Sequence, residues 1–351
     1  MSQLGLTKLS AKACYSNFFR LRRPYKINFA ITYKCNLRCQ TCNIWKKKSI
    51  DELSAEEIKK FFVENPFFSW ISLTGGEPFL RKDLPEIVGY VSDSCRDLYL
   101  LNIPSNGSQP KVVEGMVEEC LGMDIPKMVV TLSLDGPREL HDRLRGAKGS
   151  WQKSIESFQR LFALSGKKRN LEVFFEFTLS SINTGKFNQT FEAVKEEIPS
   201  LKPRDIHINL FHNSEHYYCN TEIKGFEKRP LLSELENIQG IKRHFSIKPS
   251  KILPQVYMKK AEYYIKNSRT PIPCKALEAN CFMDPVGNLY PCSIYSKKLG
   301  NIREVNFQLD SLWNTSNALD LRGKIKKLQC PNCWSPCEAY TSLLGNILRW
   351  W

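Results

Sequence analysis

Between about residues 27 and 225, short apolar runs alternate with segments whose apolar residues are spaced as on helices. The strand-like runs lie at 27–33, 70–74, 98–105, 128–134, 171–179 and 205–211. The helix-like segments between them lie at 54–65, 82–94, 111–122, 151–166 and 185–198. Repeated β-then-α units predict a parallel sheet with helices outside it. The expected fold class is therefore α/β, as a partial (β/α)6 TIM-like barrel of residues 27–225 or as an open doubly wound sheet.

Three further parts flank this region. Residues 1–26 form a leader that we expect to be helical, and residues 226–269 are a Lys-rich connector, also expected to be helical. Residues 270–345 are rich in cysteine and turn signals and contain few long apolar runs. A region of this kind is too small for a large core of its own, and a metal centre often holds it together. One local signal is sharp: Ser54 and Glu57 have the spacing of a capping box at the start of a helix.

Most of the thirteen cysteines fall into clusters. The N-terminus lacks the continuous apolar core of a secretory signal, which predicts a cytoplasmic protein with reduced thiols. Clustered cysteines in such a protein are expected to be metal ligands. The clusters are Cys35, Cys39 and Cys42, then Cys274, Cys281 and Cys292, then Cys330, Cys333 and Cys337. The isolated ones are expected to be small buried hydrophobes, and they are Cys14, Cys95, Cys120 and Cys219.

The first cluster has the spacing C-x3-C-x2-C, directly after the first predicted strand. Thiolates are soft ligands that suit zinc or iron–sulfur clusters. A structural zinc site normally closes with four ligands, and no fourth ligand is evident nearby. Three cysteines on a cluster of four irons leave one iron open, which indicates a reactive site rather than a structural one.

Polar motifs follow the next three predicted strands: GGEP at 75–78, SNG at 105–107 and SLDG at 133–136. In parallel α/β folds, chemistry belongs at the carboxyl ends of the strands. Each motif alone is typical of a turn, and Arg145 alone is typical of a surface. Their order and their common placement at strand ends indicate one site.

The combination of C-x3-C-x2-C with LTGGEPFLR one β/α unit later resembles the radical SAM superfamily. The resemblance implies that Cys35, Cys39 and Cys42 hold a [4Fe–4S] cluster whose fourth iron is chelated by S-adenosylmethionine (SAM). Such enzymes reductively cleave SAM to methionine and a 5′-deoxyadenosyl radical, which abstracts a substrate hydrogen.

The same resemblance assigns the strand-end motifs to SAM. GGEP matches the motif that contacts the methionyl amino group, chiefly through its backbone, and its glutamate could complement the ammonium. The strand-three segment lies beside the ribose, strand-four positions lie near bound SAM, and the pairing of Ser133 with Arg145 resembles the one that contacts the SAM carboxylate. The residues implied are Gly75, Gly76, Glu77, Pro78, Ser105, Asn106, Ser133, Asp135 and Arg145.

The C-terminal region resembles the SPASM extension of the same superfamily, through CKALEANCFMDPVGNLYPC, LGNI and CPNCWSPC. The resemblance implies one or two auxiliary [4Fe–4S] clusters held by the six C-terminal cysteines. The family's longer form has C-x2-C-x5-C-x3-C and a further cysteine, whereas this chain has C-x2-C-x3-C ending at Cys337. Six cysteines suffice for one complete cluster, so at least one auxiliary cluster is expected. A zinc ribbon is the alternative for this region.

Two classes of function remain: a radical SAM enzyme, and a non-catalytic iron–sulfur or zinc protein. An electron carrier needs no open iron, GGEP or Arg145, so the motifs favour the enzyme. Its substrate is expected to be a peptide or protein side chain, with a lipid, sugar or other small molecule at a membrane surface as the alternative. Only about 26 residues precede the first strand, so we expect the barrel mouth or a separate partner to bind a peptide. An electron donor such as flavodoxin or ferredoxin is also implied.

The formal net charge is +15, but the basic residues are scattered and form no recognisable nucleic-acid-binding module, so no nucleic-acid partner is expected. The leader predicts a helix with an apolar side made of Leu6, Leu9, Ala13, Phe18 and Leu21. Its flanking cations are Lys8, Lys12, Arg20, Arg22 and Arg23. Such a helix either packs on the open side of the barrel or lies on an anionic membrane surface.

Overall fold

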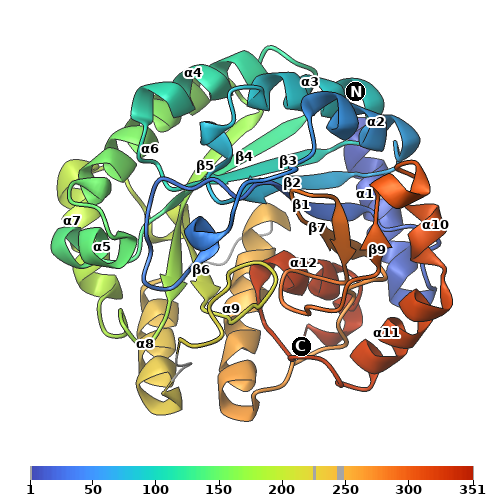
Figure 1. Cartoon of the computed structure of the whole chain (residues 1–351). Coiled ribbons are helices and arrows are strands. Elements are labelled where there is room, and N and C mark those ends of the chain that lie inside the picture. Colours follow the sequence, from blue (N-terminus) through green and yellow to red (C-terminus); the bar gives the residue numbers. More distant parts are fainter. Residues whose placement is uncertain (1, 224–226, 243–248, 351) are drawn as a thin grey trace.

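The computed structural model describes residues 2–223, 227–242 and 249–350, with a parallel sheet at its centre (Figure 1). The six barrel strands pair in parallel in the order β6-β5-β4-β3-β2-β1. Each overlaps one of the runs predicted from the sequence, so the α/β partial-barrel fold is confirmed. Their bounds are β1 (Lys26–Thr32), β2 (Trp70–Gly75), β3 (Leu100–Ser105), β4 (Lys127–Ser133), β5 (Leu171–Leu179) and β6 (Ile206–Leu210).

The predicted helices cover the outside of the sheet as α2 (Ala55–Glu64), α3 (Leu84–Ser94), α4 (Pro110–Cys120), α6 (Ser150–Lys167) and α7 (Phe187–Glu197). The capping box at the start of α2 is confirmed: Ser54 Oγ accepts from Glu57 N at 3.2 Å, and Ser54 N donates to Glu57 Oε2 at 3.0 Å. The sequence does not predict α5 (Arg138–Arg145), because this short helix is mostly charged. Burial of Leu140 and Leu144 holds it on the barrel.

Successive side chains of a strand point to opposite faces of the sheet. Outward residues such as Ile71, Leu101 and Val130 pack with the helices in one large core. Inward residues such as Asn102 and Glu176 line a central cavity instead. The barrel interior is thus hollow and partly polar, unlike the apolar interior of a closed TIM barrel.

The C-terminal region continues the barrel sheet. β7 (Asn280–Met283) pairs in parallel with β1, and β8 (Asn288–Tyr290) and β9 (Gly300–Asn301) follow antiparallel. Over the described residues the sheet therefore has nine strands. Buried residues of β7 and β8 belong to the same core as the barrel. The region therefore shares the barrel's core, which the sequence does not reveal because such short strands have no readable period. Its helices are α10 (Asp310–Trp313), α11 (Ser316–Lys326) and α12 (Pro336–Leu344).

The connector contains α8 (Lys228–Ile241) and α9 (Pro249–Asn267), and α9 lies against both β6 and α12. Tyr257 Oη donates to Trp334 O at 2.9 Å, and Trp334 Nε1 donates back to Tyr257 O at 3.0 Å. Their rings stack with centroids 5.6 Å apart. These contacts join the connector to the segment that carries the last three cysteines.

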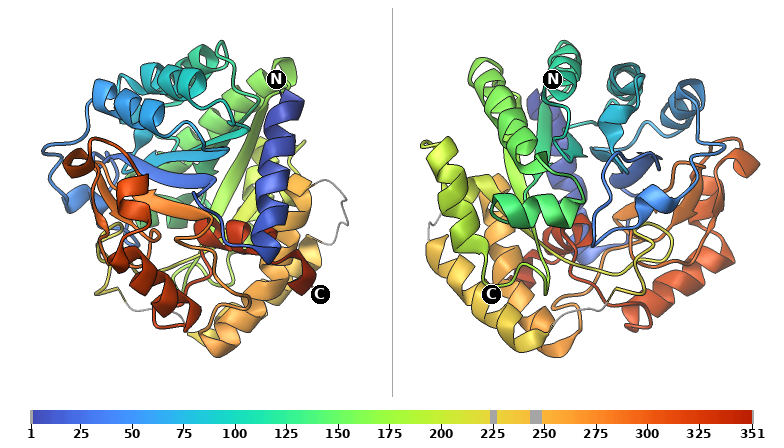
Figure 2. Two further views of the ribbon diagram at one scale, coloured as in Figure 1. Left: turned by 90° about the vertical axis from the view of Figure 1, so that its right-hand side faces the viewer. Right: turned by 60° about the vertical axis from the view of Figure 1, so that its left-hand side comes forward.

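The leader forms α1 (Ser2–Phe18), which lies beside the C-terminal end of the described chain (Figure 2). Leu9 and Ala13 are buried as expected, but Leu6 and Phe18 are 42% and 70% exposed. The expected apolar side is therefore only in part the packed side, because the helix packs through a narrow face that includes Gly5, where a Cβ would lie 2.7 Å from Leu98 O.

The position of α1 also differs from the expectation of a helix on the open side of the barrel. Lys8 and Lys12 pair with Asp97 at 2.6 and 2.7 Å, and Lys12 Nζ also donates to Phe67 O at 2.7 Å. Asp97 and Phe67 precede β3 and β2, so α1 covers the amino ends of these strands. Among the helices that the structure describes, none is long and apolar enough to cross a bilayer.

A buried asparagine generates the first prediction. Asn65 Nδ2 donates to Phe61 O at 2.7 Å and Phe307 O at 2.6 Å, and its Oδ1 accepts from Leu309 N at 3.0 Å. Asn65→Ala leaves these buried groups without partners, so we expect the free energy of unfolding to fall by about 3 kcal/mol. The measurement is urea unfolding followed by tryptophan fluorescence under anaerobic conditions.

The matched control is Asn188→Ala, which removes an exposed side chain that bonds to Asn237 on the surface. Its expected change is within about 0.5 kcal/mol. Equal losses for the two variants would contradict the role of Asn65 in joining α2 to the C-terminal region.

Candidate active site

The loop that carries Cys35, Cys39 and Cys42 runs from the carboxyl end of β1 to a short 3-10 helix, Ile44–Lys46. All three thiols line the central cavity. The backbone of the loop is held by its neighbours: Arg38 N donates to Arg145 O at 3.2 Å, and Gln40 N donates to Leu144 O at 2.8 Å. The end of α5 therefore sets the position of the loop.

The sulfurs of this loop accept backbone hydrogen bonds. The amides of Leu37 and Ile44 donate to Cys35 and Cys42, two residues before each donor. Such bonds stabilise a thiolate and tune a metal centre. Burial acts in the opposite direction and raises the pKa of Cys35 to about 11 and of Cys42 to about 12. A positively charged partner such as iron offsets that cost.

Gly75 and Gly76 let the end of β2 approach the cysteine loop. Gly75 has φ of +144°, and a Cβ on it would lie 2.3 Å from Thr32 O. A Cβ on Gly76 would lie 2.3 Å from Lys34 O. Two hydrogen bonds join the end of β2 to the end of β1 and the cysteine loop: Gly76 N donates to Thr32 O and Glu77 N donates to Lys34 O, both at 2.8 Å. The glycines thus have a packing role that the sequence motif does not reveal.

The Glu77 carboxylate joins β2 to the end of β3. Its Oε1 accepts from Ser105 Oγ at 3.0 Å and from Phe79 N at 3.2 Å, and its Oε2 accepts from Asn106 N at 2.6 Å. Burial raises the pKa of Glu77 to about 7, and these hydrogen bonds lower it in part. The sequence analysis gives the contact with the SAM amino group chiefly to the backbone, with Glu77 able to complement the ammonium. In the structure the Glu77 oxygens accept hydrogen bonds from the chain itself. Pro78 follows it on the cavity wall.

Arg145 forms an ion pair with Asp135, with 2.5 Å between Nη2 and Oδ2. Its Nη1 lies 3.7 Å from Cys39 Sγ, so the guanidinium also faces the cysteine loop. Arg145 Nε is buried and has no hydrogen-bond partner among residues 2–223, 227–242 and 249–350. The sequence analysis assigns Ser133 and Arg145 together to the SAM carboxylate, and the structure shows in addition that Arg145 pairs with Asp135. Ser133 lines the same cavity nearby.

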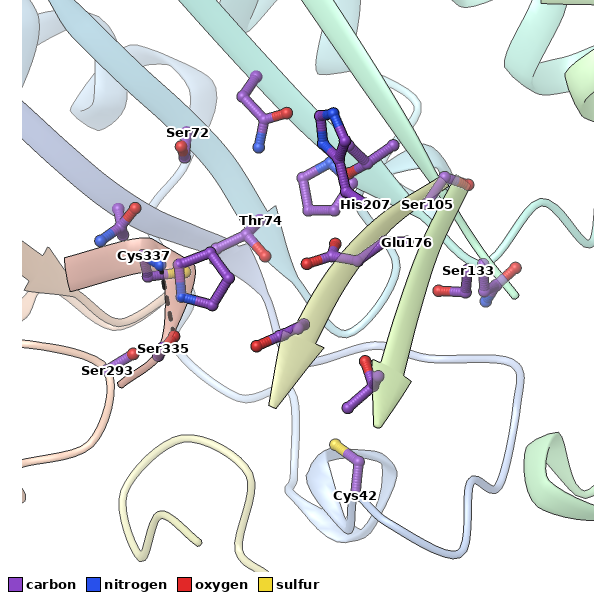
Figure 3. A pocket seen from close by; sticks show the side chains of 18 of the residues that line it. Cys42, Ser72, Thr74, Ser105, Ser133, Glu176, His207, Ser293, Ser335 and Cys337 are labelled. Atoms are coloured by element: carbon purple, nitrogen blue, oxygen red, sulfur yellow. Dashed lines mark hydrogen bonds between the residues drawn. The ribbon is translucent and has the colours of Figure 1, made fainter. Parts of the chain in front are cut away.

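The cavity has a volume of about 370 Å³ and receives side chains from every barrel strand and from the C-terminal region (Figure 3). Several polar atoms in its walls have no hydrogen-bond partner in the described part of the chain: both amide atoms of Asn28, Thr131 Oγ1, Asn209 Oδ1 and Arg145 Nε. Buried polar groups are nearly always hydrogen-bonded, so these atoms indicate a polar ligand. The sulfurs, the arginine and the unpaired polar atoms fit an iron–sulfur cluster with SAM beside it.

Three supporting residues were missed by the sequence analysis. Asn36 lies inside the cysteine motif and accepts from Asn106 Nδ2 at 2.9 Å, and its own Nδ2 donates to Ser108 Oγ at 2.8 Å. Glu52 accepts from Tyr33 N at 2.6 Å, at the start of the loop. Asn36 follows the first strand, so the rule that functional residues lie at strand ends could have indicated it. Glu52 belongs to no sequence motif that would have indicated it.

The third of these residues, Asn220, donates to Thr41 O at 2.9 Å and belongs to a segment after β6 that closes over the cysteine loop. In the same segment, Tyr217 Oη is 2.9 Å from Thr74 Oγ1. Asn43 N donates to Tyr218 O at 2.8 Å. No sequence signal marks this segment as part of the site.

Four of the six C-terminal cysteines form a second group. Cys274 lies within electrostatic reach of Cys330, Cys292 and Cys333, and Cys333 also lies within reach of Cys292. As in the first loop, the sulfurs accept backbone hydrogen bonds. Ala276 N donates to Cys274 Sγ at 3.4 Å, and Tyr295 N donates to Cys292 Sγ at 3.2 Å. The other two thiols accept from the backbone amide two residues later, Cys330 from Asn332 and Cys333 from Ser335.

The structure does not bring Cys281 and Cys337 into this group as the sequence analysis expected. Cys281 is fully buried on β7, in the core beside the apolar residues of β1, because its neighbour Phe282 takes the cavity face. Burial is the cause of its raised pKa. Cys337 lines the central cavity on α12.

Within the described part of the chain, no three Cys, His, Asp or Glu side chains converge as one metal ion requires. A structural zinc ion draws four ligands into one tetrahedron. A four-iron cube instead binds its thiolates at separate corners and holds them farther apart. Thiolates are the usual ligands of such clusters, and both groups consist of cysteines.

Known families match both halves of this arrangement. The radical SAM superfamily model matches residues 29–199, and the model of the SPASM iron–sulfur cluster-binding domain matches residues 274–347. The AdoMet-dependent heme synthase of Methanosarcina barkeri is 24% identical over 347 residues, which cover 90% of this chain and 91% of that protein.

Two further relatives extend the comparison. Mycofactocin maturase MftC of Mycobacterium tuberculosis is 24% identical, over 93% of this chain and 79% of MftC. The structure of anSMEcpe with bound AdoMet and a peptide superimposes with a TM-score of 0.58 at 18% identity, over 85% of this chain and 82% of that chain, and shows a shared fold. This chain is thus an enzyme whose cofactors are SAM, a [4Fe–4S] cluster and auxiliary iron–sulfur clusters. It belongs to the radical SAM superfamily and has a C-terminal SPASM domain.

Proposed function

We propose that this enzyme abstracts a hydrogen atom from a peptide or protein side chain and so takes part in peptide maturation. One observation carries the proposal: a single cavity is lined both by the cysteine loop and by SPASM residues. A substrate in this cavity contacts both halves of the enzyme. Relatives named as maturases, and the peptide in the anSMEcpe structure, support a peptide substrate.

In this proposal Cys35, Cys39 and Cys42 hold the cluster, and the polar groups around Arg145 bind SAM. When bound, the cluster and SAM supply a 5′-deoxyadenosyl radical that removes the substrate hydrogen. The chain's own residues orient these groups: Asp135 holds the Arg145 guanidinium toward the cysteine loop, and Glu77 fixes the end of β3 beside it. The segment after β6 covers the loop and limits its contact with water.

The auxiliary site is assigned to the four-cysteine group. Cys274, Cys292, Cys330 and Cys333 are one complete ligand set for a [4Fe–4S] cluster. Their shared pattern of backbone N–H bonds to sulfur supports this assignment, since the same pattern occurs at Cys35 and Cys42. The cluster would tie together loops that lie at the edge of the shared sheet.

A small-molecule substrate is the second candidate, favoured by the heme synthase that matches nearly the full length of the chain. The two candidates differ in what the cavity must accept. A product search with the reconstituted enzyme separates them, because modification of a peptide supports the first and modification of a tetrapyrrole supports the second.

The enzyme's surroundings are part of the proposal. A cytoplasmic flavodoxin or ferredoxin is the expected electron donor.

Peripheral contact with an anionic membrane is supported by the exposed aromatic side chains of Tyr15, Phe18 and Phe19 at the end of α1, beside Arg20 and Arg22. Lys8 and Lys12 add nothing to such contact, because both pair with Asp97.

The cluster assignment gives the second prediction. Replacing Cys35, Cys39 and Cys42 together by Ala is expected to lower bound iron by about four atoms per chain and to abolish formation of 5′-deoxyadenosine. Anaerobic reconstitution followed by iron analysis and chromatography measures both. Cys14→Ala, at an exposed thiol of α1, is the control and should change neither. Persistence of SAM cleavage in the triple variant would refute the assignment.

The third prediction concerns SAM binding. Arg145→Ala is expected to weaken SAM binding by about 10- to 100-fold, the effect of losing a charged hydrogen bond. Binding is measured by calorimetry on protein whose iron content matches that of the wild type. The control is Arg143→Ala, an exposed arginine of the same helix. Unchanged SAM affinity in Arg145→Ala would remove this residue from the site.

The fourth prediction tests the auxiliary ligand set. Cys330→Ala is expected to lose the iron of one cluster, about four atoms per chain, while Cys281→Ala keeps it. Iron analysis and electron paramagnetic resonance of the reduced proteins follow this difference. The opposite result, with iron lost from Cys281→Ala alone, would show that the cysteines regroup when the cluster binds.

A further inference from the structure

We propose that Cys337 is a free thiol of the substrate site, in an inner compartment of the barrel that binds an amide-bearing segment of the substrate. This compartment is the part of the cavity that is lined by Lys26, Asn28, Thr131, Glu176, Asn209 and Cys337. The inference rests on the proposed peptide substrate and adds where the peptide is held and by which residues.

Cys337 is set apart from the other C-terminal cysteines by its surroundings. It is the one of the six that lines the cavity. Its carbonyl oxygen accepts from Lys26 Nζ at 2.5 Å, which ties this turn of α12 to the first residue of β1. Tyr217 and Tyr218 lie within electrostatic reach of both Cys42 and Cys337. The thiol therefore lines the same cavity as the first cysteine loop.

Several polar atoms of the compartment lack partners among the residues that the structure describes. Asn28 is 2% exposed and Thr131 is 8% exposed, and neither the Asn28 amide nor the Thr131 hydroxyl has a hydrogen-bond partner. Asn209 Oδ1 is likewise unpaired. Leaving such groups unpaired costs about 1–3 kcal/mol each. A peptide backbone offers an N–H donor and a C=O acceptor at every amide, so it can satisfy both kinds of atom at once.

Charge in the compartment favours a hydrogen-bond donor on the substrate. Glu172 is paired with Lys127 at 2.5 Å, and Lys26 is bound to Cys337 O and lies 4.1 Å from the centre of the Trp70 ring. Within the described residues the Glu176 carboxyl makes no hydrogen bond, and Figure 3 shows it pointing into the cavity. Burial raises its pKa to about 7. Glu176 is thus left to bind an N–H or O–H of the substrate and would repel a carboxylate.

Iron content tests the first half of the inference. Cys337→Ser is expected to keep the iron content and the paramagnetic resonance spectrum of the wild type. Cys333→Ser, the same change four residues earlier, is expected to lose about four irons per chain. Cys337→Ala serves as a second variant if the serine variant is insoluble. Loss of auxiliary iron from both Cys337 variants would show that Cys337 is a ligand and overturn the inference.

Alkylation tests the second half. The cluster-loaded wild type is treated anaerobically with chloroacetyl-Gly-Gly-amide or with an N-alkyl chloroacetamide of equal length, and labelled cysteines are located by mass spectrometry. Exposed Cys14 is the internal reference. Relative to Cys14, Cys337 is expected to react about fivefold faster with the peptide reagent than with the alkyl reagent, as one net hydrogen bond would give. Asn28→Leu and Glu176→Leu should remove this preference.

Equal rates for the two reagents at Cys337, or a preference that survives in both variants, would overturn the amide-binding compartment. The labelling uses no SAM chemistry, so this failure differs from failure of the proposed function. If the proposed function itself fails, 5′-deoxyadenosine formation is absent or no peptide is modified, whatever the labelling pattern.

Discussion

Strand β1 is hydrogen-bonded on both sides, to β2 and to β7, and the rest of the site depends on this double pairing. Lys26 stands opposite Trp70 in one neighbour and Asn280 in the other. The radical SAM barrel and the SPASM region therefore share one sheet and one core. The cysteine loop begins at the carboxyl end of β1. Its position therefore depends on both halves of the enzyme, because β1 pairs with β2 on one side and with β7 on the other. A cavity lined by both halves follows from this arrangement.

The cysteine loop itself has little regular structure, so close backbone contacts must hold it. Gly75 and Gly76 supply the space for these contacts, and a side chain on either would overlap the carbonyl oxygens of β1 or the loop. Glu77 then joins the end of β2 to the end of β3, and the carbonyl oxygen of Arg145 joins the loop to α5. A motif whose family role is contact with SAM thus also builds the protein around the cluster site. Preorganisation of this kind means that cofactor binding need not order the loop.

Local patterns predicted a large part of the site. The spacing of Cys35, Cys39 and Cys42 places three thiols on one short loop whatever the fold, and the strand-end rule places Glu77 and Asp135 at the same edge of the sheet. Their mutual contacts were not predictable, because the sequence does not say which acceptor each donor meets. The ion pair between Arg145 and Asp135 is an example, because no spacing in the sequence indicates it.

By itself, the sequence determined the alternation of strands and helices and the radical SAM and SPASM motifs, because these are properties of consecutive residues. The tertiary structure alone decided how the six C-terminal cysteines divide. Cys281 points into the core because the register of β7 gives the cavity face to Phe282, and Cys337 reaches the cavity because α12 begins beside Lys26. Such assignments depend on contacts between residues far apart in the chain, and long-range packing rather than local spacing sets the direction of each side chain.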